Sequence, residues 1–214
     1  MKISRIQIIG NLIGLLPAFY LLSETLMGNL SADPIRTTTI ITGRTSIYAM
    51  LLSLFCTPLA RIFRMSVFHP IRKISGLFAF YYAFAHFLIF SFFDYQLNLD
   101  WIIPEIKQKP FLQVGLIALI LLIPLAVSSF KPIRQKMGKY WKKIHRLVYF
   151  ITAIILVHIT IASKGDIVDP IVLIAIYTLA MSLRFPQLRS FKIKSLPDWL
   201  KNVNAYLTNK NNAS

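Results

Sequence analysis

Hydrophobic positions in this chain fall in long blocks, and polar positions fall in the short segments between them. Five of these blocks approach the ~20 residues that an α-helix needs to cross a ~30 Å hydrocarbon layer at about 1.5 Å per residue. A sixth block is shorter and needs the aliphatic stem of Arg61 to reach the membrane surface. The pattern predicts an all-α membrane protein with a bundle of six transmembrane helices, at residues 6–26, 46–60, 74–93, 111–130, 144–162 and 167–183.

The composition supports the same interpretation. Of the 214 residues, 56% are hydrophobic and 15% are charged, and the mean hydropathy is +0.60. A soluble globular domain has a far more polar profile. The chain contains a single cysteine, Cys56, so an intrachain disulfide and a metal cluster held by several thiolates are both excluded.

We expect one membrane domain, residues 1–194, followed by a cytoplasmic tail, residues 195–214. Ser195 and Asp198 have the spacing of a helix N-cap, and apolar residues then recur at helical spacing, at Leu196, Trp199, Leu200, Val203 and Leu207. This spacing indicates an amphipathic helix on the membrane surface. From Asn204 onward, a frayed polar tail fits the sequence equally well.

Charged residues alternate from one loop to the next. The N-terminus, the second and fourth loops and the tail hold 19 of the 24 Lys and Arg residues, whereas the other loops hold seven of the eight Asp and Glu residues. By the positive-inside rule, both termini are cytoplasmic. The net charge of +16 alone would also fit a nucleic-acid-binding protein, but such a protein would not separate its charges loop by loop.

Three of the four histidines, His86, His145 and His158, lie in or at the edge of apolar blocks. A polar ring inside a membrane needs a hydrogen-bond partner or a metal, so these residues are candidates for function. Counted from the cytoplasmic border, His86 lies ~20 Å and His158 ~22 Å along its helix. Two imidazoles at matching depth on facing helices are the expected axial ligands of a b-type haem.

His145 belongs to a different level. It precedes His158 by ~20 Å and lies about 140° around an ideal helix from it, so the two cannot bind one iron. Its partner is not evident, because Arg72 and Lys73 occupy the expected position and His69 lies in a cytoplasmic loop, where a solvated role is the simpler interpretation. Any single membrane histidine can also be a hydrogen-bonded core residue or a proton-handling group.

Other candidates are weaker. Arg44, Arg61 and Arg72 can hold haem propionates or a quinone head group, although basic residues at helix ends more often mark the interface. Aromatic residues near the histidines, among them Tyr149, can line a flat macrocycle, but most aromatic residues in a small membrane protein serve packing. The sequence has no phosphate-binding glycine loop, nucleophile motif or carboxylate pair, which disfavours nucleotide hydrolysis and hydride transfer from a bound dinucleotide.

Short motifs follow one another along the chain in a characteristic order. They are Asp33-Pro34, Thr42-Gly43-Arg44, Thr57-Pro58-Leu59-Ala60-Arg61, Gly76-Leu77 with His86, Lys109-Pro110 with Gly115, Gly138 with Trp141 and His145, Tyr149, His158 and Leu183-Arg184. This set resembles the MsrQ (YedZ) family, the haem-binding membrane subunit of a bacterial periplasmic protein-methionine-sulfoxide reductase. The likeness extends from about Gly14 to Arg184. Many members have a histidine shortly before the Thr-Gly pair, where this chain has Ile40 and Ile41.

The resemblance implies a protein of the ferric-reductase-like transmembrane type in the bacterial inner membrane, with haem b and with FMN as cofactors. Electrons would pass from the quinone pool, or from a cytosolic flavin reductase, to a periplasmic molybdopterin subunit of the MsrP type that repairs oxidised methionines. Substrate chemistry would then lie on the partner. The implied metal ligands are His86, His145 and His158, and the other implied cofactor-binding residues are Arg44, Arg72, Trp141 and Tyr149.

Two alternatives stay open. A self-sufficient ferric or oxygen reductase of the same superfamily would carry a cytosolic flavin and nicotinamide domain, for which this tail is too short. A proton-coupled transporter could use membrane histidines as a relay, but it would be expected to have buried carboxylates or interrupted helices in paired halves. The acidic residues of this chain lie in outer loops instead.

Overall fold

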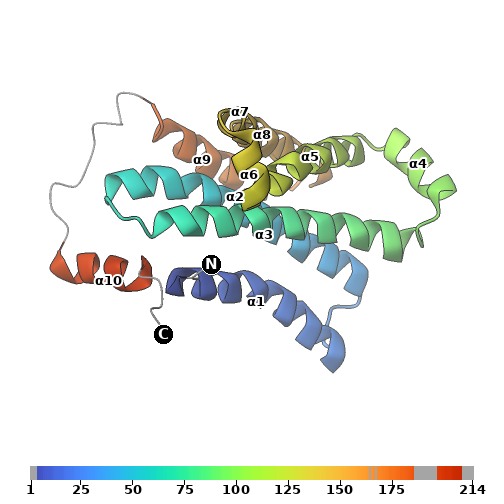
Figure 1. Cartoon of the computed structure of the whole chain (residues 1–214). Helices are drawn as coiled ribbons and strands as arrows, with labels where there is room; N and C mark the ends of the chain where they lie inside the picture. Colours follow the sequence, from blue (N-terminus) through green and yellow to red (C-terminus); the bar gives the residue numbers. More distant parts are fainter. Residues whose placement is uncertain (1–3, 164, 167, 186–196, 209–214) are drawn as a thin grey trace.

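The computed structural model describes residues 4–163, 165–166, 168–185 and 197–208, and these residues are mostly helical (Figure 1). The α-helices are α1 Arg5–Met27, α2 Pro34–Ile62, α3 Phe68–Ile89, α4 Leu99–Gln108, α5 Pro110–Val127, α6 Lys131–Met137, α7 Tyr140–His145, α8 Leu147–Ala162, α9 Val168–Ser182 and α10 Asp198–Thr208. A short π-helix, η1 Phe90–Asp94, continues α3. The prediction of an all-α protein is confirmed.

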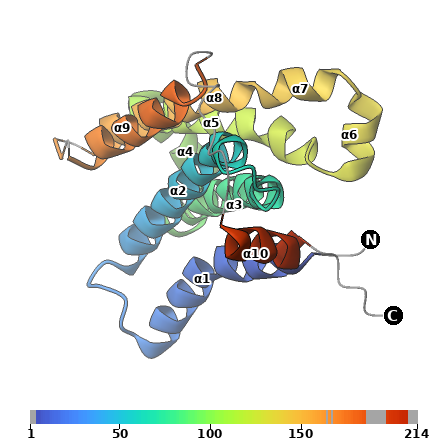
Figure 2. The same cartoon turned by 90° about the vertical axis from the view of Figure 1, so that its left-hand side faces the viewer.

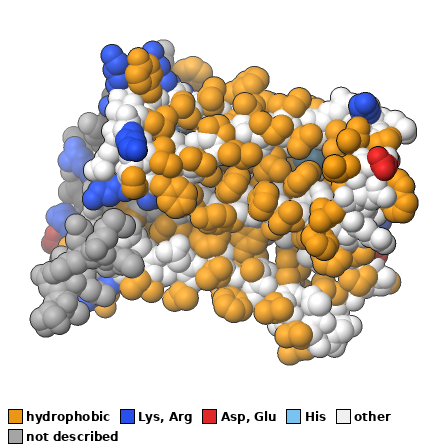
Figure 3. Space-filling model, turned by 45° about the vertical axis from the view of Figure 1, so that its right-hand side comes forward, with side chains coloured by type: hydrophobic (Ala, Val, Ile, Leu, Met, Phe, Trp, Pro, Cys, Tyr) orange, Lys and Arg blue, Asp and Glu red, His pale blue; other side chains and the backbone are white. Residues whose placement is uncertain are grey.

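Five helices of the described chain are long and apolar enough to cross a membrane. They are α1, α2, α3 continued by η1, α5, and α7 continued by α8. The sixth predicted span, residues 167–183, corresponds to α9, which is apolar but shorter at 15 residues. The protein is therefore a multi-pass membrane protein, and the sixth crossing and the orientation of the termini stay predictions. On the face drawn in Figure 3, hydrophobic side chains cover the middle, and Lys and Arg gather mainly at one end.

Two local predictions differ from the structure. The second span was expected at residues 46–60, but α2 begins at Pro34, because the Asp33 side chain caps it by accepting from the backbone N–H of Arg36 at 3.0 Å. From its proline and its place in an outer loop of the sequence, the segment from Trp101 to Pro104 is predicted to form an extracytoplasmic turn, and this prediction is wrong. It lies inside α4, whose first turn is capped by the Asn98 side chain.

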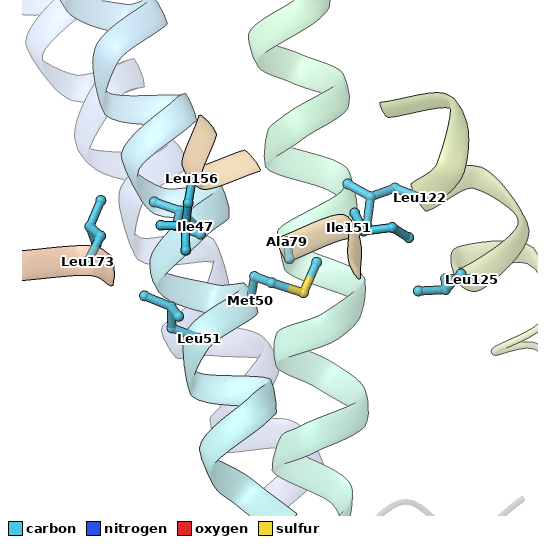
Figure 4. Close-up of a cluster of buried hydrophobic side chains, with 9 residues drawn as sticks. All are labelled: Ile47, Met50, Leu51, Ala79, Leu122, Leu125, Ile151, Leu156 and Leu173. Atoms are coloured by element: carbon cyan, nitrogen blue, oxygen red, sulfur yellow. The ribbon is translucent and has the colours of Figure 1, made fainter. Parts of the chain in front are cut away.

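The helices lie in three layers (Figure 2). The antiparallel pair α2 and α3 forms the middle layer, α1 with α10 lies on one side, and α5, α8 and α9 lie on the other. The main core lies between the middle layer and the α5, α8 and α9 layer (Figure 4). Its most deeply buried residues are Ile47, Met50, Ala79, Leu122 and Ile151.

Tyr82 attaches α1 to α3 at the kink that Pro17 introduces into α1. The Tyr82 hydroxyl donates to the Gly14 carbonyl at 2.7 Å and accepts from the Ala18 N–H at 3.2 Å. These two backbone groups would otherwise pair with each other across one turn of α1, so the hydroxyl is inserted into the helical hydrogen-bond ladder. A neighbouring helix therefore supplies partners for both of these backbone groups, as a membrane requires.

A second proline, Pro58, lies inside α2. Proline has no N–H to donate to the carbonyl four residues earlier, which here is the carbonyl of Leu54. The guanidinium of Arg184, just beyond α9, donates to that carbonyl. Arg61 donates in turn to the carbonyl of Leu183. These contacts join the C-terminal end of α2 to the end of α9.

Residues 198–208 of the tail form the helix α10, and the predicted capping residue Ser195 lies outside the described residues. Leu200 and Leu207 of α10 pack against a small cluster that contains Ile6 and Val67. Asn204 accepts from the backbone N–H of Val67 at 3.0 Å. Thus α10 rests on the start of α1 and on the turn between α2 and α3.

Candidate functional site

His86 of α3 and His158 of α8 lie against each other in the membrane-spanning part of the bundle. Their ring centroids are 6.2 Å apart, and the ring planes are inclined by 84°. Both side chains are half-buried. The two histidines that the sequence places at matching depth are therefore brought together, on two helices that are distant in the chain.

A backbone carbonyl of a further helix holds each ring, from α2 for His86 and from α5 for His158. His86 Nδ1 lies 2.8 Å from the Thr39 carbonyl oxygen of α2, and His158 Nδ1 lies 2.7 Å from the Phe111 carbonyl oxygen of α5. A carbonyl can only accept, so Nδ1 carries the proton in both rings. This assignment leaves Nε2 of each neutral imidazole with a lone pair, which is the arrangement that a metal-binding histidine needs.

Glycine makes room for each ring. A Cβ atom at Gly43 would lie 3.1 Å from His86 Nδ1, and a Cβ atom at Gly115 would lie 2.9 Å from His158 Nδ1. Both distances are closer than a side chain tolerates without movement of its neighbour. Gly43 and Gly115 therefore let α2 and α5 approach the rings closely, and each lies one turn after the residue whose carbonyl accepts the hydrogen bond.

The site thus consists of two equivalent halves. In each half the accepting carbonyl and the histidine are 47 residues apart, as Thr39 and His86 are, and a glycine follows the carbonyl four residues later. In the sequence alone, the two glycines stand out only as motif positions, and no repeat is evident. The equal separation of carbonyl and histidine could have indicated the two halves, but it becomes visible only once the hydrogen-bond partner of each ring is known.

His145 lies in a separate cavity of about 350 Å³ toward the basic end of the bundle. His145 Nε2 is 3.0 Å from the Ser128 hydroxyl, and the Trp141 ring lies 4.4 Å from the imidazole, centroid to centroid. Trp141 is fixed by its Nε1–H, which donates to the Ser128 carbonyl at 3.1 Å, and by the Arg134 guanidinium, which lies 4.2 Å from its ring centroid. His145 and Trp141 therefore share one site, apart from the His86 and His158 pair.

The remaining candidates are dispersed. Arg72 lines the same cavity and donates to the Thr57 hydroxyl at 3.0 Å. Arg44 is exposed and forms an ion pair with Asp169 between α2 and the first turn of α9. Tyr149 accepts from Arg184 at 3.1 Å. The structure thus brings Arg72 to the cavity of His145, and it brings neither Arg44 nor Tyr149 to the cavity lining.

A metal ion bound by side chains alone finds little support. Within residues 4–163, 165–166, 168–185 and 197–208, no group of three or more His, Cys, Asp and Glu side chains is arranged to hold a metal ion. Two facing imidazoles supply only two ligands. They suit a metal whose other coordination positions are filled by a macrocycle.

Outside the membrane-spanning helices, pKa values are shifted at two places. Burial, with smaller effects from the Arg72 and Arg61 charges, holds the pKa of Arg184 below its usual range. At the opposite end, burial and a hydrogen bond to Glu105 raise the pKa of Tyr95 to about 12. Hydrogen bonds from Lys109 and then Tyr95 lower the pKa of Glu105.

Comparisons with known proteins identify the family. Residues 42–156 match the family described as ferric reductase like transmembrane component. A protein of Brucella anthropi is 33% identical over 187 residues, which cover 86% of this chain and 84% of the relative. A protein of Herminiimonas arsenicoxydans is 36% identical over 79% of each chain, and one of Brucella ovis is 34% identical over 84% of this chain and 82% of its own. All three are named protein-methionine-sulfoxide reductase heme-binding subunit MsrQ.

Proposed function

The chain belongs to the MsrQ family within the ferric-reductase-like transmembrane proteins, and from this premise we propose that it is a membrane redox subunit that holds haem b between His86 and His158. Its function is to pass electrons across the membrane to a reductase subunit on the outer side. The substrate, oxidised methionine in proteins, is reduced on that partner.

The distance between the two rings carries this proposal. If each imidazole binds a central iron through Nε2, metal–nitrogen bonds of about 2.0 Å and about 1.2 Å from each nitrogen to its ring centroid give a centroid separation of roughly 6.4 Å. The observed separation of 6.2 Å is close to this value. The Nδ1 hydrogen bonds to Thr39 and Phe111 support it further, because they fix the tautomer and orientation of both rings.

Bound haem b supplies a one-electron iron couple, and the residues of this chain set the conditions for it. His86 and His158 would hold the haem iron through Nε2, and their carbonyl partners would make the rings more basic. Gly43 and Gly115 keep side chains out of the space beside the rings. The apolar surroundings limit the access of water, which is one of the means by which a protein tunes a redox potential.

The inner cavity is the second part of the proposal. We assign His145 as a metal ligand there, with Arg72 and Trp141 as cofactor-binding residues, because all three line the same cavity. An inner and an outer cofactor would divide the membrane crossing into shorter steps. The assignments of Arg44 and Tyr149 to a cofactor site and the binding of FMN stay predictions, and flavin quantification on the purified protein tests the latter.

The direction of transfer follows from the charge distribution and the family. The Lys- and Arg-rich loops support a cytoplasmic side at the end of the bundle where the inner cavity lies, and we propose that both termini lie there and the acidic loops lie outside. We propose the bacterial inner membrane as the location. The proposed donor is the quinone pool or a cytosolic flavin reductase, and the proposed acceptor is a periplasmic molybdopterin subunit of the MsrP type.

Optical spectroscopy of the purified full chain tests the haem assignment. Reduction with dithionite should give b-type haem bands, and His86→Ala and His158→Ala should each lose the low-spin component of the outer site. Phe84→Leu, an exposed change on the same helix, is the control and should keep it. A colourless wild-type protein, or bands unchanged in both histidine variants, would contradict the proposal and favour a histidine relay of the transporter type.

A further inference from the structure

The inner cavity is bordered by a second imidazole that the proposed function does not use. His69, in the first turn of α3, lines the same cavity as His145 at the end of α7. The cavity volume of about 350 Å³ lies within the ~300–1,000 Å³ that small-molecule sites occupy. No hydrogen bond to the His69 ring is among those described for residues 4–163, whereas the rings of His86 and His158 are each held by one.

The cavity wall is chemically divided. One part is apolar, and the other part is basic, formed by His69, Arg72, Lys73 and Arg134. No acidic side chain is among the described residues that line it. Such a wall suits a ligand with a broad apolar body and anionic groups on one edge, and an iron porphyrin with its two propionates has this form. The apolar part contains Met50, Leu54, Phe80, Leu122, Leu125 and Val148.

We propose that His69 is the axial ligand opposite His145 of a second haem b in this cavity. The inference rests on the proposed function, since it assumes that the chain binds haem. It adds a ligand from the first turn of α3, at a position where the sequence alone favours a solvated loop residue.

The competing ligand is Lys73. The outer half-sites repeat with a shift of 72 residues, from His86 to His158, and the same shift relates Lys73 to His145 and His69 to Trp141. Lys73 therefore lies level with His145, and His69 lies one turn, about 6 Å, nearer the cytoplasmic side. A lysine amine must lose a proton before it can bind iron, whereas imidazole binds in the neutral form that dominates at neutral pH. Both side chains border the cavity, so the imidazole is the better ligand despite the offset.

Ser128 keeps a hydrogen bond when His145 turns from it to iron, and the imidazole proton then moves from Nε2 to Nδ1. His145 Nε2 contacts the Ser128 hydroxyl at 3.0 Å, and that hydroxyl also donates to the Leu125 carbonyl at 3.1 Å. Ser128 therefore keeps a hydrogen bond when Nε2 binds metal. Trp141, stacked on His145 and fixed by Ser128 and Arg134, limits the movement of the ring.

The test measures haem content and spin state of the full chain in detergent or nanodiscs. Wild type should contain about two low-spin haem groups per chain. His69→Gly should keep the outer low-spin haem, which reports that the variant is folded, and should lose the inner haem or convert it to a high-spin form. Added imidazole should restore the low-spin form in this variant, which a structural role of His69 would not allow. Lys142→Gln, at an exposed position of α7 outside the cavity lining, is the control and should keep both low-spin groups. Lys73→Gln tests the competing ligand and should also keep them.

Three results would overturn the assignment. One is a His69→Gly variant that keeps two low-spin groups. Another is a Lys73→Gln variant that shows the change of the inner haem expected of His69→Gly, while His69→Gly itself does not. The third is a wild type with one haem per chain that His86→Ala abolishes. That single haem would then occupy the outer site, and the inner site would hold none. A wild type with no haem would overturn the proposed function as well, so the two failures are distinguishable.

Discussion

Gly43 of α2 and Gly115 of α5 are equivalent positions on two different helices: each faces Nδ1 of one histidine, which a Cβ atom at that glycine would approach to 3.1 Å and 2.9 Å respectively. Their residue numbers differ by 72, as do those of His86 and His158. The two halves of the candidate site therefore have the same construction, although the α2 and α3 pair and the α5 and α8 pair share little sequence.

This relationship predicts that alanine at either glycine weakens haem binding. The added methyl group must push the ring away, and such overpacking costs about 1–3 kcal/mol, or roughly 5- to 150-fold in affinity. Gly115→Ala should have the larger effect because its Cβ would lie closer to the ring. Haem-to-protein ratio during stepwise haem extraction is the measurement. Gly10→Ala, whose Cβ would meet the Ile74 side chain at 3.0 Å instead of a histidine, is the control, and equal loss in all three variants would contradict the prediction.

Tyr82→Phe should destabilise the protein. Removing the hydroxyl leaves the Gly14 carbonyl and the Ala18 N–H without their partner at the Pro17 kink, at a cost of about 1–3 kcal/mol in the free energy of unfolding. Thermal unfolding in detergent measures the change. Tyr81→Phe, at an exposed neighbouring position, should leave the unfolding temperature unchanged. An unchanged Tyr82→Phe variant would mean that α1 closes its own ladder at this position.

Arg184 and Pro58 should be energetically coupled. Arg184→Met removes the donor to the Leu54 carbonyl, which Pro58 leaves without its helical partner. In a Pro58→Ala background the alanine N–H can satisfy that carbonyl, so Arg184→Met should cost less there, with a coupling of about 0.5–3 kcal/mol. A double-mutant cycle of unfolding free energies measures this. Strictly additive effects would show that the arginine acts through its other contacts, such as that with Tyr149.

Acid should weaken the end of the bundle that contains α4 through Glu105. Hydrogen bonds from Lys109 and Tyr95 hold its pKa below the usual value of 4.5, so the carboxylate stabilises the folded state above about pH 4.5. This contribution is lost as the pH falls through the lowered pKa. Glu105→Gln should therefore show a shallower loss of thermal stability between pH 5 and pH 3 than wild type, with Asp100→Asn as the control on the same helix. Parallel pH profiles for wild type and Glu105→Gln would contradict the assignment.

The sequence predicts most of what depends on one helix at a time. The apolar blocks, the loop charges and the depth of His86 and His158 follow from composition and from a constant rise per residue. The depth argument succeeds because both helices run across the same layer, so counting residues from its border gives comparable heights.

Features that depend on the neighbour of a helix could not be predicted in this way. Nothing local indicates that the Thr39 carbonyl faces His86, or that Gly43 is needed for close approach, because both statements require the packing of α2 on α3. Similarly, α4 was expected to be a turn because Pro104 is a common turn residue, yet the cap at Asn98 starts a helix that accommodates it. The position of His69 could not be predicted for the same reason, since its place in a cavity depends on α7.

The equivalence of the two halves has a consequence for the insertion of a cofactor that is itself asymmetric. The backbone frame of Thr39 and Gly43 on one side matches that of Phe111 and Gly115 on the other, so the frame does not distinguish the two faces of a porphyrin whose vinyl groups break its symmetry. Only the surrounding side chains remain to select one orientation. Two sets of haem methyl resonances in the NMR spectrum, from molecules that differ by a half-turn of the ring about its α,γ-meso axis, are the expected outcome.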